Sequence, residues 1–483
     1  MRMSNTISLV LGSALLVGIH APSCAFATPA YAPLVAGNTD FALNLYEQIE
    51  GSTANNIFFS PYSISTCFGM VYAGARGETA LQMSEALSLS TNQTEVGSEF
   101  GMLQADLNAQ QTSNGITLDV ANGLWAQTNF PFLPAFLDNA SGNYDASIQQ
   151  VDFITDAPQI TDQINNWVAG QTEGMIPDLL QPGMLNWTTR LALINAIYFK
   201  GGWQSTFGTN LTQVEPFYVS PSQFVYAPLM DQQEVVPYYE DSLLQAAELP
   251  YTNSSIAMLI LLPKTNGPTN LTPAELSAVL AGLAPNWIEV KLPKFKLDLN
   301  VDLVPILKNM GMIDAFAAGV ADFSGIDGGR DLSIGTATHE AVIDVNETGT
   351  TAAGATAITV VSQAVTFPPL FEATHPFVFL LRDTNSGSIL FLGRVNDPTS
   401  GGPRLAAVAP LIQTGNGSFG VRNHQFGFNV VSTNATVVIE ACTNLSSGAW
   451  FPVSTLTLFN NSAYFSEPVP TNSPGRYYRV HSQ

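Results

Sequence analysis

The sequence predicts an α+β domain followed by a small all-β module. Two nearly uninterrupted apolar runs, residues 191–203 and 256–262, predict strands that are buried on both faces of a sheet. Apolar residues that recur every four positions within 40–49 predict a helix packed on one face. After Pro398 both patterns give way to short alternating runs at hairpin spacing. We therefore expect two domains of different class in one chain.

The composition limits the class of function. The chain has 483 residues, 46% of them hydrophobic and only 11% charged, which is enough for one large core and a smaller one. Its formal net charge is -22, from 16 basic and 38 acidic residues. This balance excludes nucleic acid and anionic membranes as expected partners, and it offers no basic surface for a heparin-type polyanion.

The first residues have the pattern of an export signal. Arg2 precedes an apolar run at 7–18, and residues 25–27 form a small-x-small cleavage site. We expect residues 1–27 to be a secretory signal peptide and the mature protein to be secreted, extracellular or periplasmic. Removal of the signal leaves Cys67 and Cys442, which fall in different expected domains and define no disulfide framework.

The first part of the body predicts helices. The helix at 40–49 is followed by Ser60, a good N-cap, and by Pro61, which suits the first helical position. The helix that begins there has apolar residues at 64, 67, 68 and 71 on one side, and a further helix is expected at 79–87.

Strands follow these helices. Residues 118–126 alternate between apolar and polar side chains, as in a half-buried strand. Asn195 lies in the middle of the apolar run 191–203, where a buried amide must find hydrogen-bond partners.

The stretch 347–367 is the most unusual part of the chain. From Thr348 to Phe367 it holds no charge and no proline, and it passes from small residues to the β-branched Ile358, Thr359, Val360 and Val361. Every residue can donate to a β ladder. Two interpretations remain open on composition: a buried strand with a loop, or an exposed loop able to become a central strand.

The order of residues in this stretch resembles the hinge and reactive loop of the serpins. Further motifs of that family occur along residues 34–399: Phe-Ser-Pro-x-Ser at 59–63, Ala-Arg-Gly-x-Thr at 75–79, the closing strands at 375–382 and 389–398, and Thr-His-Glu-Ala at 338–341. The resemblance implies a serpin domain at 34–399. That fold has a large central mixed or antiparallel sheet, further sheets, eight or nine helices and an exposed reactive loop.

The resemblance also implies the site residues. The reactive-loop hinge is then formed by Glu347, Gly349, Thr350, Thr351, Ala352, Ala353, Gly354, Ala355 and Thr356. The "shutter" beneath the central sheet would be closed by Ser60, Ser63, Asn195 and His339, Trp203 would lie in the "breach" where the loop enters the sheet, and Lys294 would pair with Glu347. The scissile region comprises Ser362, Gln363, Ala364 and Val365: counting from Glu347 puts the cut after Gln363, and counting back from residue 375 puts it at Val365.

The function implied is that of a suicide-substrate inhibitor of serine or cysteine proteases, which inserts its cleaved loop into the central sheet. Residues 360–366 contain no Lys or Arg, so the expected partner is an elastase- or subtilisin-like protease, held in a covalent acyl-enzyme complex, and not a trypsin-like one. The inhibitor is expected to be a monomer. The alternative is a non-inhibitory serpin that acts as a binding or surface scaffold through its C-terminal module.

Residues 400–403 are expected to be a linker, and residues 404–483 the all-β module. The segments at 440–450 and 475–480 resemble C-terminal modules of exported bacterial proteins. Either a carbohydrate- or surface-binding role or a passive spacer fits such a module.

Catalytic motifs are missing from the sequence. It contains no Gly-x-Ser-x-Gly elbow, and His339-Glu340 is not followed by the second histidine of a zinc protease motif. The acidic stretch 322–331 lacks the spacing of a calcium loop. We therefore expect no enzyme activity, no cofactor and no metal site.

Overall fold

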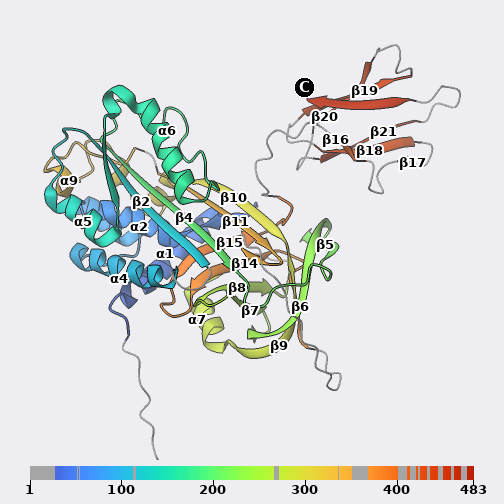
Figure 1. Ribbon diagram of the computed structural model, residues 1–483, viewed down its shortest axis with the longest axis horizontal. Helices are drawn as coiled ribbons and strands as arrows, with labels where there is room; N and C mark the ends of the chain where they lie inside the picture. Colours follow the sequence, from blue (N-terminus) through green and yellow to red (C-terminus); the bar gives the residue numbers. More distant parts are fainter. Residues whose placement is uncertain are drawn as a thin grey trace, which may run out of the picture.

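The computed structural model describes residues 28–400, apart from 52, 54, 112–115, 266–270, 336 and 351–367, together with the strands and part of the connections of residues 411–482. The body of the chain is built on two large sheets with helices packed around them (Figure 1). This is the α+β serpin fold that the sequence predicts, followed by small sheets at the C-terminal end.

The six-stranded sheet carries the candidate site. Its strands lie in the order β10 (Phe295–Asp302), β11 (Thr338–Asn346), β12 (Gly349–Thr350), β4 (Leu191–Gly202), β2 (Ile116–Gln127) and β3 (Ser147–Val151). The predicted strands at 118–126 and 191–203 are thus confirmed as β2 and β4, which are antiparallel neighbours.

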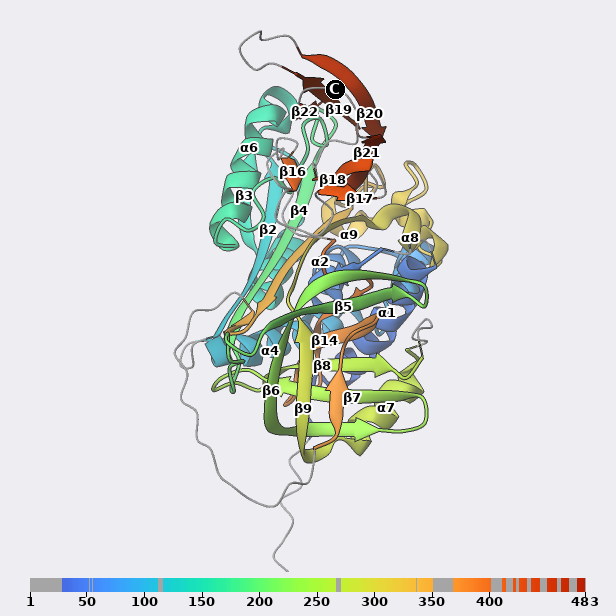
Figure 2. The same ribbon diagram turned by 90° about the vertical axis from the view of Figure 1, so that its right-hand side faces the viewer.

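The nine-stranded sheet forms the other half of the body (Figure 2). Its order is β1 (Ile57–Phe59), β15 (Ile389–Val395), β14 (Phe377–Asp383), β8 (Ile256–Pro263), β7 (Leu244–Pro250), β6 (Gln223–Glu240), β9 (Ala284–Pro293) and β13 (Leu370–Glu372), with β5 (Gln213–Ser220) paired to β6. Every residue of β8 is buried, as its apolar run predicts.

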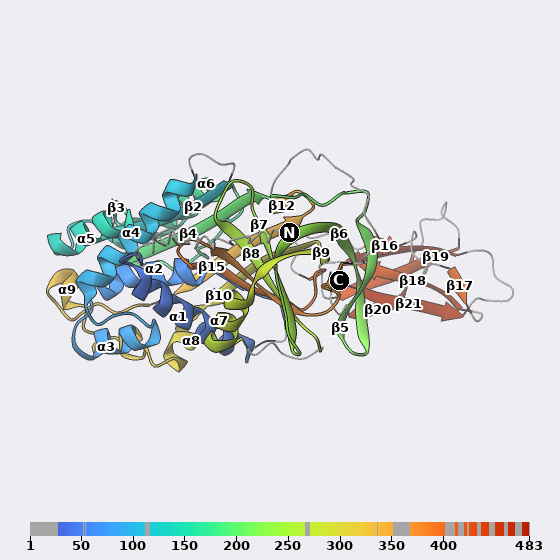
Figure 3. The same ribbon diagram turned by 90° about the horizontal axis from the view of Figure 1, so that it is seen from below.

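The helices gather mainly at one end of the body (Figure 3). The described residues form α1 (Ala32–Glu50), α2 (Pro61–Tyr72), α3 (Gly77–Ala86), α4 (Gln93–Gln111), α5 (Pro134–Tyr144), α6 (Phe153–Gln171), α7 (Pro273–Gly282), α8 (Leu303–Asn309), α9 (Ser324–Asp327) and a 3-10 turn at Asp314–Phe316. The predicted helix at 40–49 is part of α1, which begins eight residues earlier. None of the described helices is long and apolar enough to cross a membrane.

Two apolar cores lie on opposite faces of β4. Its Ile197 and Phe199 join the main core together with α2, whereas Ala192 and Ile194 join a second core beneath α6. Burial on both faces explains why the sequence of this strand shows no alternation.

The C-terminal strands form two small antiparallel sheets around their own core. One sheet contains β16 (Leu411–Gln413), β17 (Gly420–Arg422), β18 (Gln425–Val431) and β21 (Ser462–Pro468); the other contains β19 (Thr436–Cys442), β20 (Phe451–Thr457) and β22 (Tyr477–Ser482). Phe428, Val437 and Ile439 are fully buried between them. The predicted strands of this region are confirmed, while residues 401–403 of the expected linker lie outside the described residues.

Candidate functional site

The hinge lies inside the six-stranded sheet. Strand β12 is only two residues long and pairs with β11 on one side and with β4 on the other. Thr350 opposes Val345 and Gly201, and Gly349 opposes Asn346 and Gly202. In the described residues β11 pairs otherwise only with β10, and β4 only with β2. Among the described residues, no further strand therefore lies between β11 and β4.

Glycine is required at the first position of β12. Gly349 has φ of +143°, and a Cβ added there would lie 2.1 Å from the carbonyl oxygen of Gly201 and 2.7 Å from the Cα of Gly202. Any side chain would push the hinge away from β4. The neighbouring Thr350 is 1% exposed, and its hydroxyl lies 2.6 Å from the hydroxyl of Tyr251.

Glu347 anchors the base of the hinge. Its carboxylate accepts a hydrogen bond from Thr212 Oγ1 at 2.9 Å and forms an ion pair with Lys294 Nζ at 2.8 Å. Its carbonyl oxygen accepts from the backbone N–H of Phe207. Burial by itself would raise the pKa of Glu347, but the hydrogen bonds from Lys294 and Thr212 outweigh it and lower that pKa. The pairing of Lys294 with Glu347 that the resemblance implies is present.

Trp203 closes the end of the sheet next to the hinge. Its ring stacks on Tyr251 with centroids 4.6 Å apart, and its indole N–H donates to the carbonyl oxygen of Asn346 at 2.9 Å. Its backbone N–H donates to the carbonyl oxygen of Thr348. Trp203 thus contacts the chain on both sides of Glu347, at the place where the resemblance puts the breach.

Ser60 and His339 connect α2 to the sheet. The backbone N–H of Ser60 donates to Nε2 of His339 at 2.9 Å, and Ser60 Oγ donates to the carbonyl oxygen of Leu390 while accepting from the N–H of Ser63. Ser60 is thus the predicted N-cap of α2. Burial lowers the pKa of His339 to about 4, so its ring is neutral near pH 7.

Asn195, which the resemblance implies as a further member of this set, forms its hydrogen bond with a different strand. Its amide donates to Oδ1 of Asn122 on β2 at 2.6 Å, and Asn122 in turn donates to the carbonyl oxygen of Tyr144. Within the described part of the chain, no hydrogen bond joins Asn195 to His339, although both line the same cavity. Oδ1 of Asn195 and Oγ of Ser63 are buried with no partner among the described residues.

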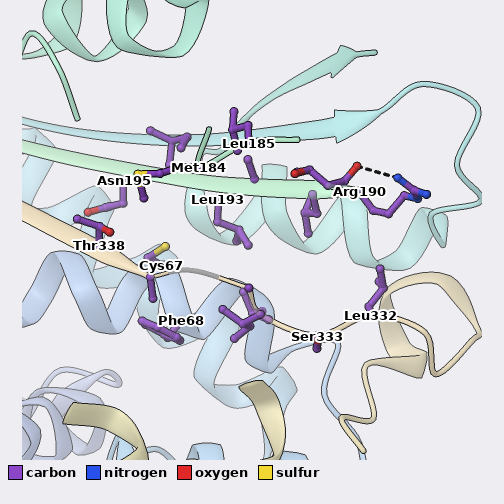
Figure 4. A pocket seen from close by; sticks show the side chains of 18 of the residues that line it. Cys67, Phe68, Met184, Leu185, Arg190, Leu193, Asn195, Leu332, Ser333 and Thr338 are labelled. Atoms are coloured by element: carbon purple, nitrogen blue, oxygen red, sulfur yellow. Dashed lines mark hydrogen bonds between the residues drawn. The ribbon is translucent and has the colours of Figure 1, made fainter. Parts of the chain in front are cut away.

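A cavity of about 540 Å³ lies between β4, α2 and the chain around β11. Leu193, Asn195 and Thr338 line it from the sheet, and Cys67 and Phe68 from α2 (Figure 4). Cys67, one of the residues predicted on the apolar side of this helix, borders the cavity, and burial raises the pKa of its thiol to about 12. The cavity thus reaches Leu193 and Asn195 of β4 and Thr338 and His339 of β11.

Part of the predicted site cannot be placed. Hinge residues 351–356 and the scissile residues Ser362, Gln363, Ala364 and Val365 lie outside the described residues. Conversely, sequence reasoning missed Thr212, Asn122 and Tyr251, whose contacts with the site come from distant parts of the chain. Within the described residues no group of His, Cys, Asp and Glu is arranged to hold a metal.

Comparison with known proteins agrees with this architecture. A family model described as "Serpin (serine protease inhibitor)" matches residues 36–398. A leukocyte elastase inhibitor from Equus caballus is 38% identical over 380 residues, which is 76% of this chain and 99% of that protein. An uncharacterized serpin-like protein from Thermococcus kodakarensis is 37% identical, covering 76% of this chain and 87% of that one. The solved structure of cleaved Serpin 42Da matches with a TM-score of 0.67 and 30% identity, over 76% of this chain and 99% of that one.

Proposed function

The chain belongs to the serpin family, and we propose that it inhibits serine or cysteine proteases as a suicide substrate whose cleaved loop inserts into the six-stranded sheet. One observation supports this proposal above the others. The hinge residues Gly349 and Thr350 already pair with β11 and β4, and no other strand of the described chain lies between these two.

The protease supplies the catalytic groups for cleavage of the loop. Its nucleophilic oxygen or sulfur attacks the carbonyl carbon of the scissile residue, the peptide C–N bond breaks, and the leaving amino group takes up the proton that the nucleophile gave to the catalytic histidine. An acyl-enzyme ester or thioester remains on the inhibitor. Insertion of the loop must then carry the protease away before water hydrolyses this bond.

The register of β12 sets the level that each inserted residue reaches. Thr350 opposes Val345 and Gly201, and the antiparallel ladder moves one residue down each neighbour for every residue of the loop. Thr356 accordingly comes level with both His339 and Asn195. Because side chains alternate between faces, Thr356 shares the inner face with Thr350.

The sizes of the inner-face residues fit this register. Ala352 comes level with the large side chains of Ile343 and Phe199, which belong to the main core. Ile358 comes level with Leu193, which lines the cavity. A small residue therefore enters where the core is full, and a large one where it is hollow, so insertion replaces empty space with packed side chains.

Thr356 also fits chemically. Since Nε2 of His339 accepts a hydrogen bond from Ser60, the proton of the neutral ring lies on Nδ1. Oδ1 of Asn195 lacks a donor. A threonine hydroxyl at this level can accept from Nδ1 of His339 and donate to Oδ1 of Asn195, so the buried amide oxygen would gain its donor on insertion.

The target is proposed to be an elastase- or subtilisin-like protease. Residues 360–366 offer only uncharged side chains, and the cut is placed after Gln363 or at Val365. Several relatives carry the name leukocyte elastase inhibitor. We further propose that residues 1–27 direct export, that the inhibitor is a monomer, and that the module at 404–483 serves as a surface-binding or spacer element.

The test uses the mature full-length chain with leukocyte elastase and with subtilisin. The expected result is a complex with the protease that survives denaturing electrophoresis, and a large rise in the thermal midpoint after a single cut in the loop. Thr350→Arg places a charge at a position that is 1% exposed and should turn the inhibitor into a substrate that is cut without forming the complex.

Deletion of residues 404–483 is the matched control. If the chain inhibits through its reactive loop, this deletion should leave complex formation unchanged. If wild type and Thr350→Arg are both merely cut, with no complex and no rise in the midpoint, the loop does not insert, and the scaffold function of the C-terminal module becomes the better account.

A further inference from the structure

The outer face of the β5–β6 hairpin is an exposed surface without charge, which we call the hairpin strip. Strand pairing places Val214 opposite Pro228 and Pro216 opposite Tyr226. The ladder is irregular between Phe217 and Ser220, but ring contacts bring Tyr218 and Phe224 beside Tyr226 on the same face. The hairpin strip consists of Val214, Pro216, Tyr218, Phe224, Tyr226 and Pro228.

The side chains of the hairpin strip lie in solvent although most of them are large and apolar. Val214 is 67% exposed, Tyr218 44%, Phe224 51% and Tyr226 63%. The rings contact one another, with centroids 6.0 Å apart for Tyr218 and Phe224 and 5.4 Å for Phe224 and Tyr226. The opposite face of the hairpin packs normally, since Phe217 and Ala227 are fully buried. The strip is therefore not part of any core in the described chain.

Such a surface is unusual on a chain with a formal net charge of -22. Contiguous exposed apolar surface of this kind marks an interaction site. Tyr and Phe are also the side chains enriched at the centre of protein interfaces, where they bury much area at small entropic cost.

The hairpin strip is connected directly to the end of the reactive loop. The backbone N–H of Tyr218 donates to the carbonyl oxygen of Thr374 at 2.7 Å, and Thr374 follows β13, the first strand after the loop. In turn, the N–H of Glu289 on β9 donates to the carbonyl oxygen of Pro369. The hairpin thus lies in the same sheet as the point where the loop rejoins the body.

The short chain between the scissile region and the hairpin favours the target protease as the partner that covers the hairpin strip. From Val365 to Thr374 the chain spans at most about 32 Å even when fully extended. A protease of roughly 240 residues has a radius of gyration of about 18 Å and hence a diameter of about 45 Å. A protease bound to the loop near Val365 is thus large enough to reach past Thr374 to the hairpin.

We propose that the hairpin strip is a docking surface for the target protease, which meets it with an uncharged apolar rim beside its active site while it binds the reactive loop. This inference rests on the proposed inhibitory function and adds a second determinant of target choice to the loop sequence. Apolar contact outside the loop would hold the protease before acylation and so raise the association rate without affecting insertion.

The test measures binding of full-length inhibitor to leukocyte elastase and subtilisin whose catalytic serine is replaced by alanine, so that no cleavage occurs. The double variant Phe224→Ser/Tyr226→Ser should bind at least one of these enzymes at least tenfold more weakly than wild type. Phe224→Leu/Tyr226→Phe keeps the surface apolar and should retain the affinity. Leu81→Ser is the control: Leu81 is 50% exposed on α3, at the opposite end of the body from β5 (Figure 3).

The experiment distinguishes failure of the docking proposal from failure of the proposed inhibitory function. Equal affinity of wild type and the serine double variant, or no binding of either inactive enzyme, overturns the docking proposal. The same holds if wild type sediments as a dimer and the double variant as a monomer, because the strip is then an interface between two copies. If inactive protease binding depends on the strip while active protease forms no stable complex, docking stands and the inhibitory function falls.

Discussion

Acid should destabilise the native protein through His339, and the size of the effect follows from its environment. Burial lowers the pKa of this imidazole from 6.5 to about 4, and Nε2 accepts the N–H of Ser60 only while the ring is neutral. Because the folded pKa lies below the unfolded one, the unfolded chain takes up the proton first as pH falls. Stability is therefore fully present above pH 6.5 and is lost as pH falls towards 4.

The magnitude follows from linkage. The lowered pKa of His339 should reduce the free energy of unfolding by about 2 kcal/mol at pH 5 and by about 3 kcal/mol at pH 4, relative to its value at pH 7. Carboxylates also titrate in this range, so His339→Gln serves as the reference, since its amide oxygen can still accept from Ser60. The assay is urea unfolding of both proteins from pH 7 to pH 4.

The expected result is a difference between wild type and His339→Gln that changes by about 2–3 kcal/mol over this range, with wild type losing more. Parallel curves for the two proteins would show that His339 takes up its proton in the folded state near its ordinary pKa. The described contacts of His339 would then be wrong.

Three further predictions concern the hinge and the sheet. Gly349→Ala forces a Cβ against the carbonyl of Gly201 and should raise the number of inhibitor molecules consumed per protease trapped, which is measured by titrating protease activity. An unchanged ratio would contradict the close approach of Gly349 to the backbone of Gly201. Thr356→Val should leave the uncut protein as stable as wild type but reduce the stability gained on cleavage by about 1–3 kcal/mol, because the buried Oδ1 of Asn195 stays unpaired. Equal gains would rule out the proposed register. Trp203→Ala removes the stacking on Tyr251 and should lower the unfolding free energy of the uncut form by about 3–5 kcal/mol, as measured by urea titration. A loss below about 1 kcal/mol would mean that Trp203 is not part of the core.

Local features of the site could be predicted from sequence because they depend on neighbouring residues. Ser60 caps α2 by bonding to the N–H three residues on, and a serine before proline indicates this directly. The strand character of β4 and β8 follows from their unbroken apolar runs. The uncharged, small-to-branched order of 348–367 likewise indicates a segment compatible with a sheet interior, whatever the rest of the chain does.

The partners of the polar residues were decided by tertiary structure alone. Asn195 required a partner on sequence grounds, but only the pairing of β4 with β2 brings Asn122, 73 positions away, to its amide. Thr212 reaches Glu347 across 135 positions in the same way. The alignment of Asn195 with His339 depends on the two-residue register of β12, and no local pattern carries that information because it arises from strands far apart in the chain.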